Sequence, residues 1–134
     1  MRTKAREVVF EVIFASRFSD GIDENLKNAL YKKEKLGEDD IAYADEVLTL
    51  FKEHESEFSA IVDSHSIAFP KSRLFPADIS ILYLALAEIK YMDEVPDKVA
   101  VNEAANIASK YSSEKSATFI SGILSEVIKE KEGV

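Results

Sequence analysis

Side chains that could bind RNA occur at two places in this sequence, the N-terminus and a stretch near the C-terminus. The first seventeen residues carry four cations against two carboxylates, a net charge of +2. Residues 101–124, VNEAANIASKYSSEKSATFISGIL, place Tyr111 and Phe119 close to Lys110 and Lys115. Cations that meet phosphates and aromatics that stack on bases are what single-stranded RNA requires. Because an aromatic residue at a helix junction more often belongs to the core, the pattern alone is a weak signal.

The sequence offers no positive case for an enzyme or a metal site. It has no Cys, and its two histidines, His54 and His65, are eleven residues apart without HExxH-type spacing. Carboxylate pairs such as Asp39 and Asp40 lack the apolar surroundings that would separate their pKa values. Neither a glycine-rich phosphate loop nor a nucleophile elbow occurs. We therefore expect no catalytic residue, no metal and no cofactor.

The charge of the chain is unevenly distributed. The net charge is −8, which by itself disfavours nucleic acid as a partner. Residues 38–63 hold nine acidic side chains and one Lys, a net charge of −8 in that segment alone. A solvated acidic face explains this segment best, and the asymmetry leaves room for a small basic site elsewhere.

Composition and periodicity predict an all-α protein with a single domain over residues 1–134. The chain is 46% hydrophobic with only four Gly and three Pro, and its apolar residues recur at helical spacing. In the first helix Phe10, Phe14 and Phe18 are expected to face the core. We expect about seven helices, in residues 4–18, 22–36, 39–51, 58–67 (ending before Pro70), 76–92, 97–111 and 113–128.

Two further expectations concern packing and location. The helix that begins at Pro76 is apolar on nearly every face, which predicts a central position. Gly122 lies inside the last expected helix, where Gly costs about 1 kcal/mol against Ala, so we expect it to permit close packing near Ala85. The longest apolar run is well short of the roughly 20 residues of a membrane helix. We expect a soluble cytoplasmic protein without membrane association.

Several motifs resemble those of the NusB family of transcription antitermination factors. The block VPDKVAVNEAANIASKYSSEKSATFISGIL is similar to the family's Pro-x-x-Val-Ala-(Ile/Val)-Asn-Glu-Ala, Ala-Lys-x-(Tyr/Phe) and Phe-Val-Asn-Gly-(Val/Ile)-Leu sequences. Earlier matches extend the likeness over essentially the whole chain, and they are Ala5, Arg6, Glu7, Asp40, Tyr43, Leu82, Ala85 and Glu88. The resemblance implies an all-α fold of two small helical subdomains.

The resemblance also implies partners and a site. Members of the family bind single-stranded boxA RNA together with NusE, a ribosomal small-subunit protein, and the complex modifies RNA polymerase so that ribosomal RNA transcription resists termination. The resemblance places NusE near Phe14 and Asp78. It places RNA on two groups of residues, which are Arg2, Lys4 and Arg6 in the first helix and Tyr111, Lys115, Ser116 and Phe119 near the last.

This chain departs from the family pattern in ways that leave alternatives open. It has three cations where many members have an arginine-dense run, Ser121 replaces the usual Asn, and Tyr83 replaces the usual Arg. Weak RNA affinity without a partner is expected, because each phosphate contact contributes electrostatically. One alternative is a protein-interaction module that has lost RNA binding. Another is an RNA-binding partner of a separate RNA-modifying enzyme.

Overall fold

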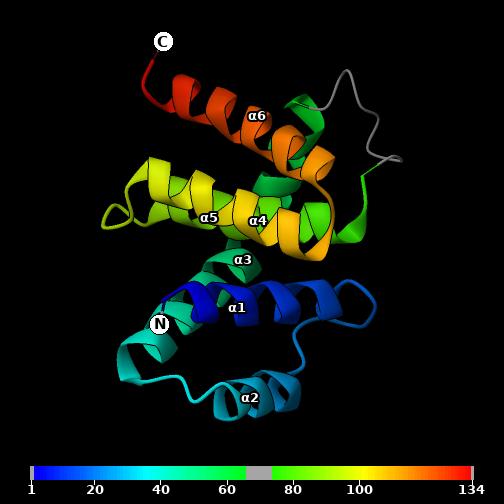
Figure 1. The fold of residues 1–134 in the computed structure, drawn as a ribbon, viewed down its shortest axis with the longest axis vertical. Helices are drawn as coiled ribbons and strands as arrows, with labels where there is room; N and C mark the ends of the chain where they lie inside the picture. The colour runs from blue at the N-terminus through cyan, green and yellow to red at the C-terminus, as the bar shows by residue number, and fades with distance from the viewer. Residues whose placement is uncertain (1, 66–73, 134) are drawn as a thin grey trace.

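The computed structural model describes residues 2–65 and 74–133, and these form six α-helices without any β-strand (Figure 1). The predicted all-α fold is confirmed. Within the described residues no helix has the length and apolar character needed to cross a membrane. The helices are α1 (Arg2–Ser16), α2 (Glu24–Lys33), α3 (Glu38–His65), α4 (Pro76–Tyr91), α5 (Asp97–Tyr111) and α6 (Glu114–Lys131).

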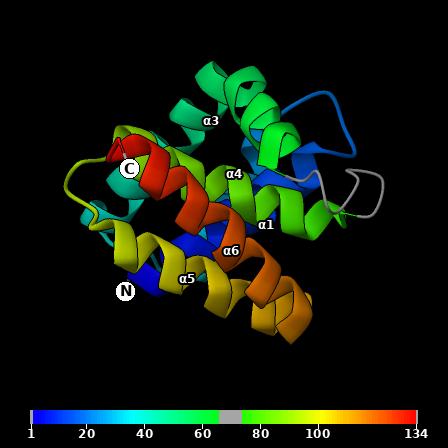
Figure 2. The same cartoon turned by 90° about the horizontal axis from the view of Figure 1, so that it is seen from above.

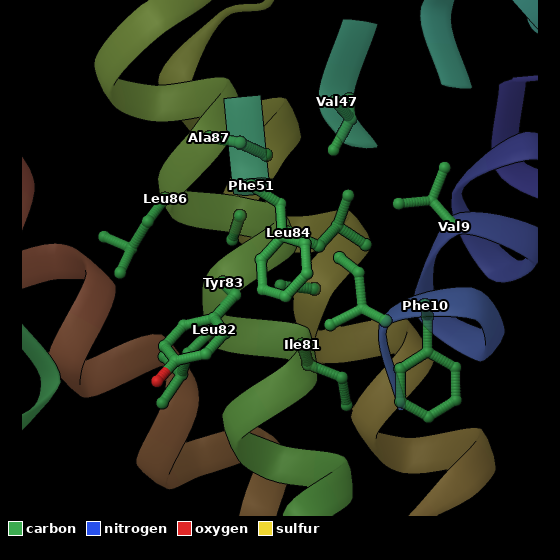
Figure 3. Close-up of a cluster of buried hydrophobic side chains, with 14 of the residues drawn as sticks. Val9, Phe10, Val47, Phe51, Ile81, Leu82, Tyr83, Leu84, Leu86 and Ala87 are labelled. Atoms are coloured by element: carbon green, nitrogen blue, oxygen red, sulfur yellow. The ribbon is translucent and has the colours of Figure 1, made fainter. Parts of the chain in front are cut away.

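Helix α4 is the centre of the molecule. It contacts α1 and α3 on one side and α5 and α6 on the other, and Figures 1 and 2 show it enclosed between these pairs. Every residue from Asp78 to Ile89 is buried, as predicted from a sequence that is apolar on nearly all faces. Figure 3 shows part of this core, where side chains of α4 such as Leu84 lie near side chains from α1 and α3, among them Val9 and Phe51.

The start of each helix follows local sequence chemistry. Pro76 occupies the first turn of α4, where its missing N–H has no partner to lose. At the start of α6, the Ser113 hydroxyl caps the helix by accepting the backbone N–H of Ser116 at 3.0 Å. Helix α3 begins at Glu38, so Asp39 and Asp40 lie inside its first turn.

The third and fourth expected helices are two halves of α3. The backbone leaves helical geometry at His54, with φ −121° and ψ 16°, and the helix continues beyond that kink to His65. This continuation accounts for six helices in place of about seven. The expected end of the fourth helix, near Ile67 and before Pro70, lies outside the described residues.

Two packing expectations are wrong. Gly122 is exposed, and a Cβ atom added there would meet nothing within 4 Å, so it does not permit a close approach of helices. Phe18 is 68% exposed because α1 ends at Ser16, two residues before it. The chain leaves the helix in a turn over residues 17–20, and this turn carries Phe18 away from the core.

Candidate RNA-binding surface

The two outermost N-terminal cations lie on the surface but are already paired. The Nε of Arg2 donates to Asp40 at 3.0 Å, and its guanidinium lies 4.5 Å from the centre of the Tyr43 ring. The Nζ of Lys4 lies 3.8 Å from a carboxylate oxygen of Glu34. Both side chains keep about two-fifths of their surface exposed, 41% and 42%. A phosphate could reach either one, but it would compete with a carboxylate of the same chain.

Arg6 is not on the surface, which corrects its expected role as a phosphate contact. Its side chain is 5% exposed, and its Nε and Nη2 donate to the two carboxylate oxygens of Glu88 at 3.0 and 2.9 Å. The Tyr43 hydroxyl donates to the same carboxylate at 2.8 Å, and Glu103 lies 3.6 Å from Nη1 of Arg6. Burial disfavours the charged guanidinium, but the bond to Glu88 and nearby carboxylates outweigh it and raise the pKa of Arg6. Arg6 therefore holds α1, α3, α4 and α5 together from inside.

A second buried pair joins α6 to α4 where both helices begin. Ser116 is 6% exposed and Asp78 is 3% exposed, and the Ser116 hydroxyl donates to Asp78 Oδ2 at 2.9 Å. Ser116 in turn receives hydrogen bonds from the hydroxyls of Ser112 and Ser113. Asp78 and Ser116 therefore fix the starts of α4 and α6 relative to each other, and both side chains are largely inaccessible to a ligand.

An apolar hollow of about 480 Å³ opens above this pair. Phe75, at one edge, is 61% exposed, and Phe119 lies half-buried within the hollow. Lys115 is exposed and forms no ion pair with any residue that the structure describes. The hollow therefore combines aromatic walls with an available cation. Its lining consists of Leu74, Phe75, Asp78, Ser113, Lys115, Ser116, Thr118 and Phe119.

Four aromatic rings form a row along α1. The ring of Tyr111, at the end of α5, lies 5.1 Å from Phe10, centre to centre. Phe10 lies 6.0 Å from Phe14, and Phe14 lies 5.2 Å from Phe18. Exposure increases along α1, from 4% for Phe10 through the half-buried Phe14 to 68% for Phe18. Phe14 therefore lies between a buried ring, Phe10, and an exposed ring, Phe18.

The predicted site residues fall into two separate groups. Figures 1 and 2 show the N-terminus and the start of α6 on opposite sides of the molecule. Arg2 and Lys4 therefore do not adjoin the hollow that holds Lys115 and Phe119. The Tyr111 hydroxyl donates to Glu7 of α1 at 2.7 Å, so contacts between α5 and α1 lie between the two groups.

Phe75 and Glu7 matter to this surface but were absent from the predicted site, whereas Lys110 had been noted in the sequence as a cation beside Tyr111. Lys110 donates to Glu7 at 2.7 Å beside Tyr111, and Phe75 is one of the most exposed large apolar side chains in the described chain. The sequence contained a signal for Phe75, because the residue before a proline is held out of the helix that follows. It held no comparable signal for Glu7, because its hydrogen-bond partners Lys110 and Tyr111 are more than a hundred residues away.

The arrangement defines a class of protein, an all-helical binding module with cations and exposed aromatics near helix ends. Comparison with known proteins supplies the family, since the family model of the NusB family matches residues 3–129. The transcription antitermination protein NusB of Agathobacter rectalis is 33% identical over 133 residues, covering 93% of this chain and 97% of that protein. The chain therefore belongs to the NusB family.

Solved structures share the fold. A NusB structure from T. maritima superposes with a TM-score of 0.87 at 27% identity and covers 97% of this chain and 92% of that chain. A structure of the antitermination factors NusB and NusE in complex with dsRNA gives a TM-score of 0.85 at 22% identity, covering 96% of each chain. The latter likeness concerns the fold alone.

Proposed function

We propose that this chain is a transcription antitermination factor that binds single-stranded boxA RNA together with NusE. It acts in the cytoplasm as a non-catalytic adaptor of the RNA polymerase antitermination complex, and residues 1–134 form its RNA-binding domain. Membership of the NusB family over residues 3–129 supports the proposal. The names of its relatives, which are transcription antitermination proteins, also support the proposal. One of them, from Finegoldia magna, is 32% identical over 98% of this chain.

The observation that carries RNA binding is the hollow where α4 and α6 begin. Phe75 and Phe119 offer aromatic faces there, and the Lys115 ammonium is exposed beside them. Every nucleobase has a π face, so aromatic side chains bind single strands by stacking, and cations nearby bind the backbone. We assign base contacts to Phe119 and Phe75 and a phosphate contact to Lys115.

The remaining predicted residues divide into exposed residues that contact RNA or NusE and buried residues that position the helices. Arg2 and Lys4 reach phosphates as exposed cations at the start of α1, and Tyr111 presents a ring that is 39% exposed. Arg6 and Ser116 act from inside by fixing the helices that carry these groups. The aromatic surface of Phe14 and Phe18 is proposed to meet NusE, with Asp78 supporting the adjoining start of α4.

A binding titration tests the proposal. A fluorescently labelled boxA-like single-stranded RNA is titrated with the chain alone and with the chain plus NusE, and a scrambled RNA of equal length serves as the control. We expect weak binding by the chain alone, because its net charge is −8, and tighter, sequence-dependent binding with NusE. Equal affinity for boxA-like and scrambled RNA in the presence of NusE would contradict the proposal.

The second candidate is a protein-interaction module without RNA binding. One observation favours it, which is that the N-terminal cations are occupied, Arg2 by Asp40 and Lys4 by Glu34. The acidic outer surface of α3 would then dock a basic partner. The same titration separates the candidates, because a module without RNA binding would not bind the labelled RNA, either alone or with NusE.

A further inference from the structure

Glu7 lies at the contact between α1 and α5 and binds three groups that a phosphate could use. Its Oε1 accepts the Lys110 ammonium at 2.7 Å and the Tyr111 hydroxyl at 2.7 Å. The Lys4 ammonium lies 4.0 Å from the same oxygen. Two cations and a hydroxyl therefore converge on a single oxygen atom.

Glu7 remains charged in this position. Burial raises the pKa of its carboxyl, but the hydrogen bonds from Lys110 and Tyr111 and the charge of Lys4 outweigh burial and lower it. Burial and the bond to Glu7 raise the pKa of Tyr111, which keeps its hydroxyl a donor. At neutral pH the site thus contains a carboxylate, two ammonium groups and a neutral phenol.

The donors are exposed although the carboxylate is not. Glu7 is 8% exposed, whereas the Lys110 and Lys4 side chains are 56% and 42% exposed and Tyr111 is 39% exposed. An ammonium and a hydroxyl directed at one anionic oxygen form the charge-assisted bonds that a phosphate oxygen also accepts. Oε1 of Glu7 therefore lies where the three donors could otherwise hold a phosphate oxygen of a bound strand.

We propose that Glu7 is an internal competitor for the RNA backbone, which lowers the affinity of this surface for phosphate. The proposal rests on the RNA-binding function proposed above. A strand that offers only its backbone must draw Lys110 away from Glu7 and gains little charge interaction. A strand that also supplies stacked bases and a NusE contact compensates for that loss, so Glu7 improves discrimination between RNAs at the expense of affinity.

The opposing explanation is that Glu7 is a tether. On that view Glu7 holds Lys110 and Tyr111 in the orientation that RNA needs, and its removal weakens binding. The two explanations give opposite signs for one substitution. They also predict different contributions of Lys110 to RNA binding once Glu7 is replaced by a neutral residue.

The test compares Glu7→Gln with Glu126→Gln. Glu126 pairs with Lys129 at 3.5 Å on the exposed surface of α6, so its substitution makes the same change in net charge away from the site. Affinity for boxA-like RNA, for scrambled RNA of equal length and for oligouridine is measured with NusE at several salt concentrations, and melting temperature is measured for each variant. For Glu7→Gln we expect about twofold to fivefold tighter binding, the range of an exposed ion pair. The gain should be larger for oligouridine. The slope of the logarithm of the binding constant against the logarithm of salt concentration, the salt slope, should be steeper by about 0.7 for each additional phosphate that the protein neutralises.

A double-mutant cycle keeps the test decisive if Glu7→Gln lowers stability. Lys110→Ala should weaken RNA binding more in the Glu7→Gln background than in the parent, because only there is the ammonium free to meet phosphate. Equal or weaker binding by folded Glu7→Gln, or a smaller effect of Lys110→Ala in its background, overturns the competitor in favour of the tether. If the folded parent and Glu7→Gln both fail to distinguish boxA-like from scrambled RNA, the proposed function fails and the inference fails with it.

Discussion

The guanidinium of Arg6 and the carboxylate of Glu88 form a buried two-point ion pair between the first helix and the central helix. The Nε–Oε1 and Nη2–Oε2 distances are 3.0 and 2.9 Å, and Glu88 is 1% exposed. The hydroxyl of Tyr43 completes the carboxylate's hydrogen bonding from α3. A charge inside a core is tolerated only when it is paired and hydrogen-bonded. The role of Arg6 is therefore to stabilise the core, and its side chain is not part of an exposed binding surface.

Removing either partner of this pair should strongly destabilise the fold. Breaking a buried ion pair typically costs about 3–5 kcal/mol, since the remaining charge is left without a partner. We expect this loss in the free energy of unfolding for Arg6→Ala and for Glu88→Ala, measured by urea denaturation. Arg2→Ala is the matched control, and its exposed pair with Asp40 should cost at most about 1 kcal/mol. An Arg6→Ala protein of normal stability that had lost RNA binding would return Arg6 to the RNA surface.

The sequence contained part of the information needed to place Arg6 correctly. Arg6, Val9 and Ile13 are three and seven residues apart and share one face of α1, so the same periodicity that predicted the core also directs Arg6 inward. Glu88 is the one carboxylate between Ile79 and Ile89, and a buried carboxylate requires a cation. The expectation that Arg6 binds phosphate came from the number of cations near the N-terminus, and it did not consider on which face of the helix each cation lies.

The fold was more predictable than the surface, because a helix packed against a core places its apolar residues at a regular spacing in the sequence. Polar contacts between residues far apart in the sequence follow no such spacing. Apolar residues on every face of α4 identified the central helix, and Pro76 and Ser113 marked where helices begin. The polar run around His54 suggested a break, although the backbone only kinks there. The contacts of Glu7 with Lys110 and Tyr111 depend on how α1 and α5 meet, which no local pattern reports.

Replacing Gly122 by Ala should stabilise the protein. The site is exposed within α6 and open around its Cα, so helix propensity decides the outcome and favours Ala by up to about 1 kcal/mol. Gly21→Ala is the control, since it also has open space but its φ of +114° strains any side chain. Thermal denaturation should move the two melting temperatures in opposite directions. A lower melting temperature for Gly122→Ala would restore a packing role for this glycine.

Two substitutions around the hollow should affect RNA binding in different ways. Lys115→Ala should weaken binding and reduce the salt slope by about 0.7, because one phosphate is no longer neutralised. Phe75→Ala should cost about 1–3 kcal/mol of binding free energy by loss of stacking and leave the salt slope unchanged.

Exposure makes the second substitution informative. Phe75 is 61% exposed, so its truncation should not change the melting temperature, whereas truncation of the half-buried Phe119 should lower it. Titrations at several salt concentrations, with melting temperature measured on the same samples, check both expectations. If Phe75→Ala with NusE binds boxA-like RNA as the parent does, the hollow is not a base-stacking site.

Glu7 and Glu11 should affect the pH dependence of stability with opposite signs. Burial, with the nearby charges of Glu34 and Glu7, raises the pKa of Glu11, whereas the pKa of Glu7 is lowered because hydrogen bonds from Lys110 and Tyr111 outweigh burial. A raised carboxyl pKa adds stability below the unfolded value, about 4.3, and this stability is lost as the pH rises through the folded pKa. A lowered pKa adds stability above the unfolded value, and it is lost as the pH falls through the folded pKa.

Glu11→Gln should therefore gain stability relative to the parent as the pH rises from about 4 to about 6, around the ordinary carboxyl value. The gain should stay within about 0.5 kcal/mol, the usual range of a surface substitution. Glu7→Gln should instead lose stability relative to the parent as the pH rises from about 3 to about 4.3, because the parent gains the charged contacts of Glu7 between its lowered pKa and the ordinary carboxyl value. Melting temperatures from about pH 3 to about pH 6, with Glu126→Gln as the exposed control, measure both differences. Curves for the two variants that move in the same direction would show that these carboxylates do not occupy the opposed electrostatic environments seen along α1.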